Sequence, residues 1–221
     1  MAENCAEKYD RLADGFAERS WANLHYDMVR RRNLTTHWGR PLQRGDSVLE
    51  LGCGDGYLAE LLLRQGLRYR GVDIAPKMVA RSKLRIAQAG FEASIVSSDA
   101  NHLSLNDPVD GVISYMGSFF SFIDDPLALL KRFRPYVRAK IILDLNPRGP
   151  LNVNSAIEIL RAAGFEKITW RPYFVPMSVK LPTAILSMLT ICEDFEPVRS
   201  LPLRWKCNTL IKGECGATSI E

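Results

Sequence analysis

Long hydrophobic runs are missing from this sequence of 221 residues. The most apolar stretch, from Leu181 to Ile191, is interrupted by Pro182 and is far shorter than the roughly 20 residues with which a helix crosses a bilayer. The first residues are charged and lack the apolar core of a secretory signal peptide. We therefore expect no membrane span and a cytoplasmic protein.

Cysteine is scarce and follows no recognisable pattern. The odd number of cysteines and the absence of C-x-x-C spacing argue against a disulfide framework and against a zinc site. We expect reduced thiols and no metal site. Cys53 lies inside a glycine-rich stretch, where its small side chain is predicted to fill space. The cysteines are Cys5, Cys53, Cys192, Cys207 and Cys215.

Charge of one sign does not dominate the chain. The net charge of +4 neither demands nor excludes a nucleic-acid partner. Basic residues cluster at 30–32 and again between 131 and 140, with few aromatic residues among them. Because stacking aromatics accompany basic charge in single-stranded RNA sites, nucleic-acid binding is the less favoured interpretation. A hydrophobic content of 47% and this length fit one globular domain.

The most informative segment is the glycine-rich stretch within residues 48–57. An apolar strand pattern runs directly into glycines at alternate positions, and residues 57–63 then follow a helical apolar pattern. The turn thus opens a helix whose N-terminus faces a ligand crevice, and an acid follows about 20 residues later at Asp73, as in nucleoside-binding folds. Glu50 and Asp55 would repel a pyrophosphate but tolerate a cationic ligand that bears an amino acid. The glycines are Gly52, Gly54 and Gly56.

Strand and helix patterns alternate from residue 45 to about 170, which predicts a mostly parallel sheet with right-handed crossovers. Residues 1–44 are predicted to form a helical N-terminal lid, and residues 45–221 the core. Within the core, the proline-punctuated stretch 172–204 reads as an irregular apolar insertion. Predicted strands after the glycine loop lie near 69–74, 94–99, 110–116, 140–146, 165–170 and 205–214.

The motifs and their order resemble the class I S-adenosylmethionine-dependent methyltransferases. The resemblance implies a Rossmann-like α/β fold with a seven-stranded, mostly parallel sheet, helices on both faces and an antiparallel last strand. It also implies S-adenosylmethionine as the methyl donor and S-adenosylhomocysteine as the product. In this family Asp73 would bind the ribose hydroxyls, Ile74 would lie against the adenine, Asp99 would face the adenine amino group, and the amide of Ala100 would meet the ring. The remaining implied cofactor residues are Glu50, Gly52, Gly54, Gly56 and Ser114.

Three motifs that are missing from the sequence restrict the class of molecule that could accept the methyl group. No N/D-P-P-Y/F run follows the fourth predicted strand, no pair of glutamates flanks it, and it is not followed by carboxylate ligands for Mg²⁺. Residues 9–16 resemble the N-terminal segment of ubiquinone-type and natural-product-type small-molecule methyltransferases, with Phe16 in place of a second tyrosine. That resemblance places Tyr9 near the methionine part of the cofactor. The apolar insertion suits a hydrophobic acceptor, although its residues would equally complete the core.

The predicted reaction is a metal-free in-line displacement, for which alignment and desolvation matter most. Among candidate bases, His25 and Tyr115 are the leading choices, ahead of His37, His102, Tyr173 and Asp144. The expected partner is a small-molecule acceptor, and a homodimer is compatible with the sequence. Two alternatives stay open: a non-catalytic cofactor-binding or partner subunit, and a methyltransferase that acts on RNA or protein.

Overall fold

The computed structural model describes residues 5–115, 119–146, 148–149, 151–199 and 208–216. The N-terminal region contains the helices α1 (Cys5–Leu12), α2 (Phe16–Ser20) and α3 (Leu24–His37). The strands are β1 (Ser47–Leu51), β2 (Arg68–Asp73), β3 (Ser94–Ser97), β4 (Val109–Ser114), β5 (Val137–Leu145), β6 (Glu166–Tyr173) and β7 (Asn208–Glu214). The later helices are α4 (Tyr57–Arg64), α5 (Pro76–Gln88), α6 (Phe119–Phe122), α7 (Pro126–Phe133), α8 (Val153–Ala162), α9 (Thr183–Cys192) and α10 (Glu196–Arg199), with 3₁₀ turns η1 (Ala100–His102) and η2 (Arg134–Tyr136).

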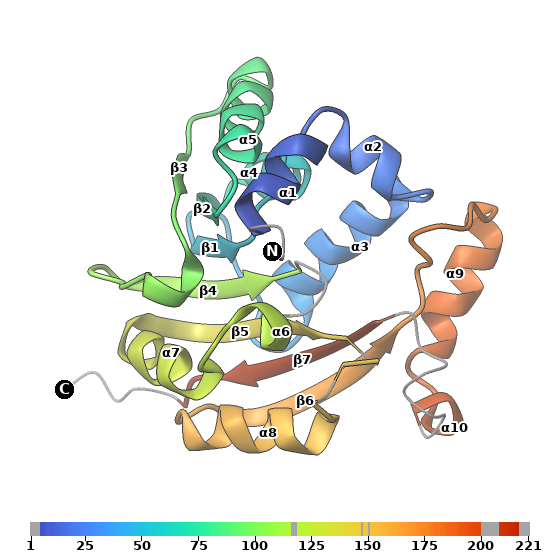
Figure 1. The fold of residues 1–221 in the computed structure, drawn as a ribbon. Helices are drawn as coiled ribbons and strands as arrows, with labels where there is room; N and C mark the ends of the chain where they lie inside the picture. Colours follow the sequence, from blue (N-terminus) through green and yellow to red (C-terminus); the bar gives the residue numbers. More distant parts are fainter. Residues whose placement is uncertain (1–4, 116–118, 147, 150, 200–207, 217–221) are drawn as a thin grey trace.

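The strands form one seven-stranded sheet in the order β3-β2-β1-β4-β5-β7-β6 (Figure 1). All pairs are parallel except those of β7, which runs antiparallel to both β5 and β6. The predicted Rossmann-like sheet with an antiparallel last strand is confirmed. The strand order reverses between β1 and β4, and ligands bind at such switch points beyond the carboxyl ends of the strands.

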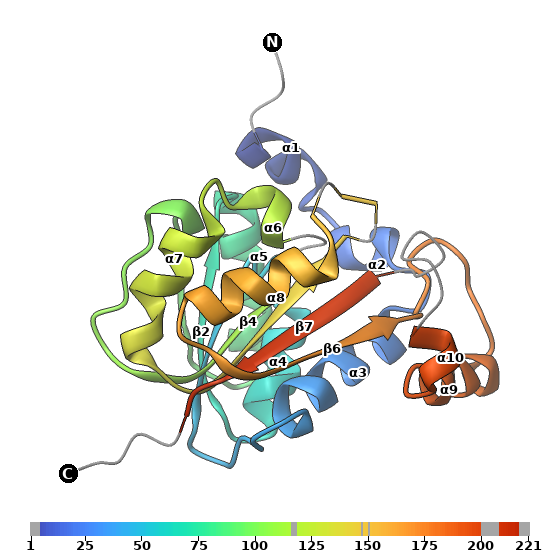
Figure 2. The same cartoon turned by 90° about the horizontal axis from the view of Figure 1, so that it is seen from below.

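Both faces of the sheet are buried, and alternate residues of each strand serve different faces. Val48 and Ile142 belong to the apolar core shared with α3, α4 and α5. Leu49 and Ile141 belong to the core shared with α7 and α8. The helix layers lie on opposite sides of the sheet, as Figures 1 and 2 show together. β1 is accordingly buried at every position, as a central parallel strand covered on both faces should be.

Side-chain caps begin α7 and α8, and a glycine follows the end of α8. Asp125 begins α7 by accepting a hydrogen bond from the amide of Ala128 at 2.9 Å, and Asn152 begins α8 by accepting one from the amide of Ser155 at 2.9 Å. α8 ends just before Gly164, whose φ of 90° confirms the predicted left-handed cap.

The region after β6 differs most from the sequence-based expectation. The stretch 172–204 was expected to be irregular, but residues 183–192 form the regular helix α9, and β6 continues to Tyr173. Residues 200–204 lie outside the described part of the chain, as do residues 205–207 of the last predicted strand. The prolines predict irregular structure, but Pro182 directly precedes α9. Proline is tolerated at the start of a helix, so it does not interrupt α9.

Within the described residues, no helix is both long and apolar enough to cross a membrane. The four described cysteines, which exclude Cys207, are free thiols. Cys53 is buried beside Gly71, where an added Cβ would come within 3.0 Å of its sulfur, so it fills space as predicted.

Candidate active site

A cavity of about 430 Å³ lies where β1, β2, β3 and β4 end, between the sheet and the N-terminal helices. Most of the sequence-predicted site residues meet there. Gly56, Ser114 and His25 are not among the lining residues. The predicted residues that do line the cavity are Tyr9, Glu50, Gly52, Gly54, Asp73, Ile74, Asp99, Ala100 and Tyr115.

The glycine loop has the geometry that a close ligand requires. Gly52, Gly54 and Gly56 all have positive φ, at 72°, 54° and 82°. A Cβ added to Gly54 would meet nothing within 4 Å, so this position faces open space in the cavity. A Cβ on Gly56 would instead lie 2.9 Å from the Cα of Ser82 in α5. Gly56 therefore allows α4 to pack against α5, a structural role in place of the predicted ligand contact.

Asp73, the last residue of β2, and Asp99, two residues after the end of β3, both line the cavity and accept hydrogen bonds from backbone amides. The Asp73 carboxylate accepts hydrogen bonds from the amides of Gly54 (2.8 Å) and Ala75 (2.9 Å). Burial raises its pKa, and these amide bonds act in the opposite direction. Asp99 caps η1 by accepting a bond from the amide of Asn101 at 2.9 Å. The side-chain amide of Asn101 donates to the same Oδ1 atom of Asp99 at 3.0 Å.

Glu50 is the most perturbed acid of the cavity. It is only 4% exposed, and Tyr69 donates a hydrogen bond to its Oε2 atom at 2.6 Å. Burial raises the pKa of this carboxyl to about 8, although the bond from Tyr69 opposes the shift. A positive ligand group placed beside Glu50 would favour its ionised form.

Arg31 is the cavity residue that sequence reasoning missed. It belongs to the basic cluster 30–32, yet the structure buries it to 8% exposure and places it on the cavity wall. Asp27 forms an ion pair with it, 2.9 Å from Arg31 Nε to Oδ2, and the Arg31 Nη1 atom donates to the carbonyl of Tyr115 at 3.0 Å. The spacing of an aspartate and an arginine four residues apart on one helix is the sequence feature that could have indicated the pair.

The two leading candidate bases lie in different parts of the structure. His25 is exposed, contacts the hydroxyl of Tyr57 at 3.4 Å, and lines an outer groove instead of the cavity. The Tyr115 hydroxyl lies 3.1 Å from the Thr35 hydroxyl, and burial raises the pKa of Tyr115 well above its usual range. Ser114 is fully buried at the end of β4.

The N-terminal helices close the cavity from one side by docking on α5. The Lys77 amide donates to Asp10 at 2.8 Å, and Arg81 pairs with Asp14 at 2.7 Å. Tyr9 lies edge-on to Phe16, with ring centroids 5.9 Å apart, and both line the cavity. From the stretch 172–204, Met177 is the described residue that reaches the cavity.

Comparison with known proteins agrees with this geometry. Residues 48–140 match a family model described as a methyltransferase domain. Residues 48–140 therefore carry a methyltransferase domain. That match confirms the predicted family, and it spans the glycine loop, Asp73, Asp99 and the strands from β1 to the first part of β5.

The methyltransferase domain is similar to a ubiquinone biosynthesis O-methyltransferase of Paramagnetospirillum magneticum, with 35% identity over 38% of this chain and 36% of that protein. The chain thus matches little more than a third of that relative's length.

Solved structures align over nearly the whole chain. One is a putative methyltransferase in complex with the Trm112 methyltransferase activator of Haloferax volcanii, with a TM-score of 0.62, 20% identity, and coverage of 94% of this chain and 97% of that chain. Another is a magnesium protoporphyrin IX methyltransferase from Synechocystis with bound S-adenosylmethionine, with a TM-score of 0.55, 16% identity, and coverage of 98% and 86%. At these identities the likeness establishes the fold.

Proposed function

We propose that the protein transfers a methyl group from S-adenosylmethionine to a small, hydrophobic acceptor. The observation that carries the proposal is the cavity itself, in which the open glycine loop meets Asp73 and Asp99 at the sheet's switch point. The methyltransferase domain match and the solved neighbour with bound S-adenosylmethionine support the same donor.

The charges of the cavity wall complement this donor. Among the described lining residues, Arg31 is the one basic side chain, whereas several are carboxylates. S-adenosylmethionine carries a sulfonium, an ammonium and one carboxylate, so an acidic wall with a single arginine matches its charge pattern. The acidic lining residues are Glu50, Asp55, Asp73, Asp99 and Asp124.

Each residue is assigned to the part of S-adenosylmethionine that its position in the cavity favours. Asp73 would hold the ribose, Asp99 and Ala100 would face the adenine edge, and Ile74 would contact its plane. Glu50 would face the amino group of the methionine part. Arg31, absent from the sequence-based assignment, would bind the carboxylate of the donor.

When bound, S-adenosylmethionine supplies a methyl group on a sulfonium that is already an excellent leaving group. The chain's task is then to align the acceptor and exclude water. Apolar side chains of the cavity wall suit a hydrophobic acceptor. These apolar residues are Phe16, Trp21, Met28, Phe122, Ile123 and Met177.

Calorimetric titration with S-adenosylmethionine and S-adenosylhomocysteine tests the proposal, followed by a methyl-transfer screen over phenols, amines and carboxylic acids with apolar substituents. Micromolar binding and transfer to a member of the panel are expected. Folded protein that binds neither compound would refute the assignment. Binding without transfer to any panel member would instead favour a non-catalytic subunit, and salt-sensitive RNA binding with RNA methylation would favour a macromolecular acceptor.

A further inference from the structure

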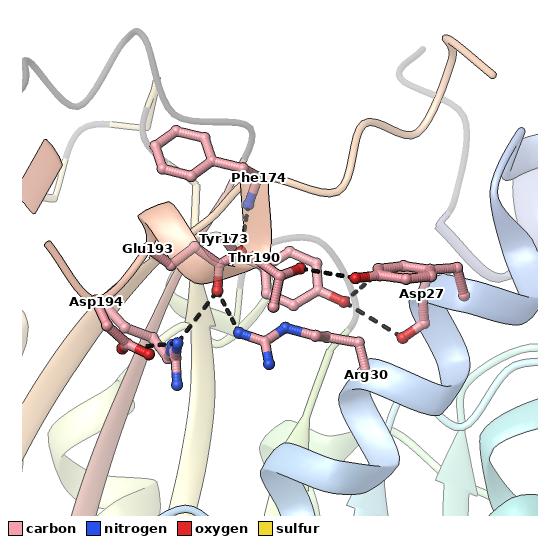
Figure 3. Close-up of polar contacts among 9 residues, drawn as sticks. Asp27, Arg30, Tyr173, Phe174, Thr190, Glu193 and Asp194 are labelled. Carbon is pink, nitrogen blue, oxygen red and sulfur yellow. Dashed lines mark hydrogen bonds and ion pairs between the residues drawn. The ribbon is translucent and has the colours of Figure 1, made fainter. Parts of the chain in front are cut away.

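Polar contacts join the N-terminal half of α3 to the end of β6 and to the segment around α9 (Figure 3). The Tyr173 hydroxyl donates to the carboxylate of Asp27 at 2.5 Å, and the Tyr26 hydroxyl lies 3.0 Å from the hydroxyl of Thr190 in α9. Arg30 pairs with Glu193 at 2.5 Å. Segments about 150 residues apart in the sequence are thus held side by side.

The contact between Tyr173 and Asp27 is connected to the cavity through Arg31. Asp27 is 1% exposed and stands between Tyr173 and Arg31, with its Oδ1 atom bound to the tyrosine and its Oδ2 atom paired with Arg31 Nε at 2.9 Å. Burial raises the pKa of Asp27, and both Arg31 and the Tyr173 hydroxyl oppose that shift. The tyrosine therefore supports the charged carboxylate that pairs with Arg31.

The orientation of Arg31 is defined on several sides. Its Nε atom faces Asp27, and its Nη1 atom is bound to the Tyr115 carbonyl at 3.0 Å. Its guanidinium carbon lies 5.3 Å from the ring centroid of Tyr115, 5.8 Å from that of Trp21 and 6.0 Å from that of Tyr173. Among the described residues, none forms a hydrogen bond with Nη2, and Arg31 lines the cavity.

We propose that Tyr173 and Asp27 are positioning residues that aim the Arg31 guanidinium at the carboxylate of the bound donor. The inference rests on the proposed function. It makes the end of β6 part of the donor site, although Tyr173 itself does not line the cavity. A flexible arginine fixed in advance loses less conformational freedom on binding, so the fixed geometry strengthens recognition of a carboxylate.

The test compares two ligands by calorimetry. S-adenosylhomocysteine contains the amino-acid carboxylate, and 5′-methylthioadenosine has the same nucleoside and thioether without the amino-acid group. The ratio of the S-adenosylhomocysteine dissociation constant to that of 5′-methylthioadenosine measures recognition of the amino-acid group, whose carboxylate is the part assigned to Arg31. A defect that weakens both ligands equally leaves this ratio unchanged. Arg31→Lys is expected to weaken S-adenosylhomocysteine selectively and so to raise the ratio.

Tyr173→Phe removes the hydroxyl and keeps the ring. We expect it to weaken S-adenosylhomocysteine binding by roughly three- to tenfold, the range for one lost hydrogen bond, and to leave 5′-methylthioadenosine binding unchanged. Tyr26→Phe is the matched control, because it removes a hydroxyl contact between the same segments that does not touch Arg31. It should leave both affinities unchanged.

Asp27→Asn provides a second variant of nearly the same shape, and it should weaken the same ligand selectively. If Asp27→Asn bound S-adenosylhomocysteine more tightly, Asp27 would be a competitor for Arg31, and the inference would be overturned. Wild-type selectivity in Tyr173→Phe, with a clear loss in Arg31→Lys, would overturn the positioning role alone. Failure of the wild type to bind either ligand would refute the proposed function as well.

Discussion

The carboxylate of Asp73, at the end of β2, accepts a hydrogen bond of 2.8 Å from the amide of Gly54, 19 residues earlier in the glycine loop. Its other oxygen accepts one from the amide of Ala75 at 2.9 Å. The side chain proposed to hold the ribose therefore also fixes the loop that approaches the ligand. A substitution at Asp73 changes both functions, and the choice of substitution can separate them.

We expect Asp73→Ala to abolish S-adenosylhomocysteine binding and to lower the free energy of unfolding by about 1–2 kcal/mol, since two amides lose their acceptor. Asp73→Asn keeps one carbonyl oxygen for the loop but loses the charged acceptor for the ribose. It should be the more stable variant and still bind roughly tenfold more weakly than wild type. Calorimetry and urea unfolding provide both measurements, and wild-type affinity in Asp73→Asn would contradict the ribose assignment.

Proton release on donor binding is predicted from Glu50. Its pKa of about 8 means that the carboxyl is mostly protonated at pH 7 without ligand. A cationic ligand favours the ionised form, so binding should release close to one proton at pH 7, and affinity should rise with pH up to about 8. The change is best followed between about pH 6 and 7.5, where the amino group of the ligand remains protonated.

Calorimetry in buffers of different ionisation enthalpy measures this release directly. Glu50→Gln is the matched control, because the amide is isosteric with the neutral acid and cannot ionise. It should bind more weakly, without proton release and with little pH dependence over the same range. An equal release in wild type and Glu50→Gln would assign the proton to another group.

The parts of the site that lie close together in the sequence could be predicted. Gly52, Gly54 and Asp73 belong to a continuous strand–turn–helix–strand unit, in which local backbone geometry decides what faces the ligand. The mostly parallel arrangement of the sheet followed from the alternation of strands and helices. Gly56 was assigned to the ligand because its spacing matches, but its position under Ser82 depends on how two helices pack.

Contacts between distant segments could not be predicted. The environment of Arg31 depends on Tyr173, which follows it by more than 140 residues. The four-residue spacing to Asp27 can indicate an ion pair on one helix, but it does not indicate that the pair lies at the cavity. His25 looked suitable because it lies in the N-terminal region, yet α3 directs it toward the outer groove. The rotation of α3 about its own axis determines which of its side chains face the cavity, and this rotation depends on tertiary packing.

Gly56→Ala should destabilise the protein by about 2–4 kcal/mol, because the added methyl group combines an unfavourable φ with a close approach to the backbone of α5. The φ is 82°, and the new Cβ would lie 2.9 Å from the Cα of Ser82. Gly90→Ala separates the two causes, since φ is 79° there and no atom lies within 4 Å of the added Cβ. Urea unfolding should show a loss of only about 1 kcal/mol for Gly90→Ala. Equal losses would mean that packing against α5 contributes nothing.

Glu193 is expected to be the most sensitive charged residue of the segment after β6. Its side chain is fully buried, pairs with Arg30 at 2.5 Å and Arg171 at 3.3 Å, and accepts a hydrogen bond from the Phe174 amide at 2.9 Å. Glu193→Ala would leave two arginines without their shared buried counter-charge, so we expect a loss of roughly 3–5 kcal/mol in the free energy of unfolding.

Asp194→Ala is the matched control, because Asp194 pairs with the same Arg171 at 2.9 Å but its side chain is 64% exposed. Solvent screening should limit its effect to less than about 1 kcal/mol. Hydrogen exchange should additionally locate the weakening in Glu193→Ala to α9 and the first turns of α3, the elements that this carboxylate joins. Similar unfolding energies for the two variants would show that the Arg30–Glu193–Arg171 cluster does not hold these elements together.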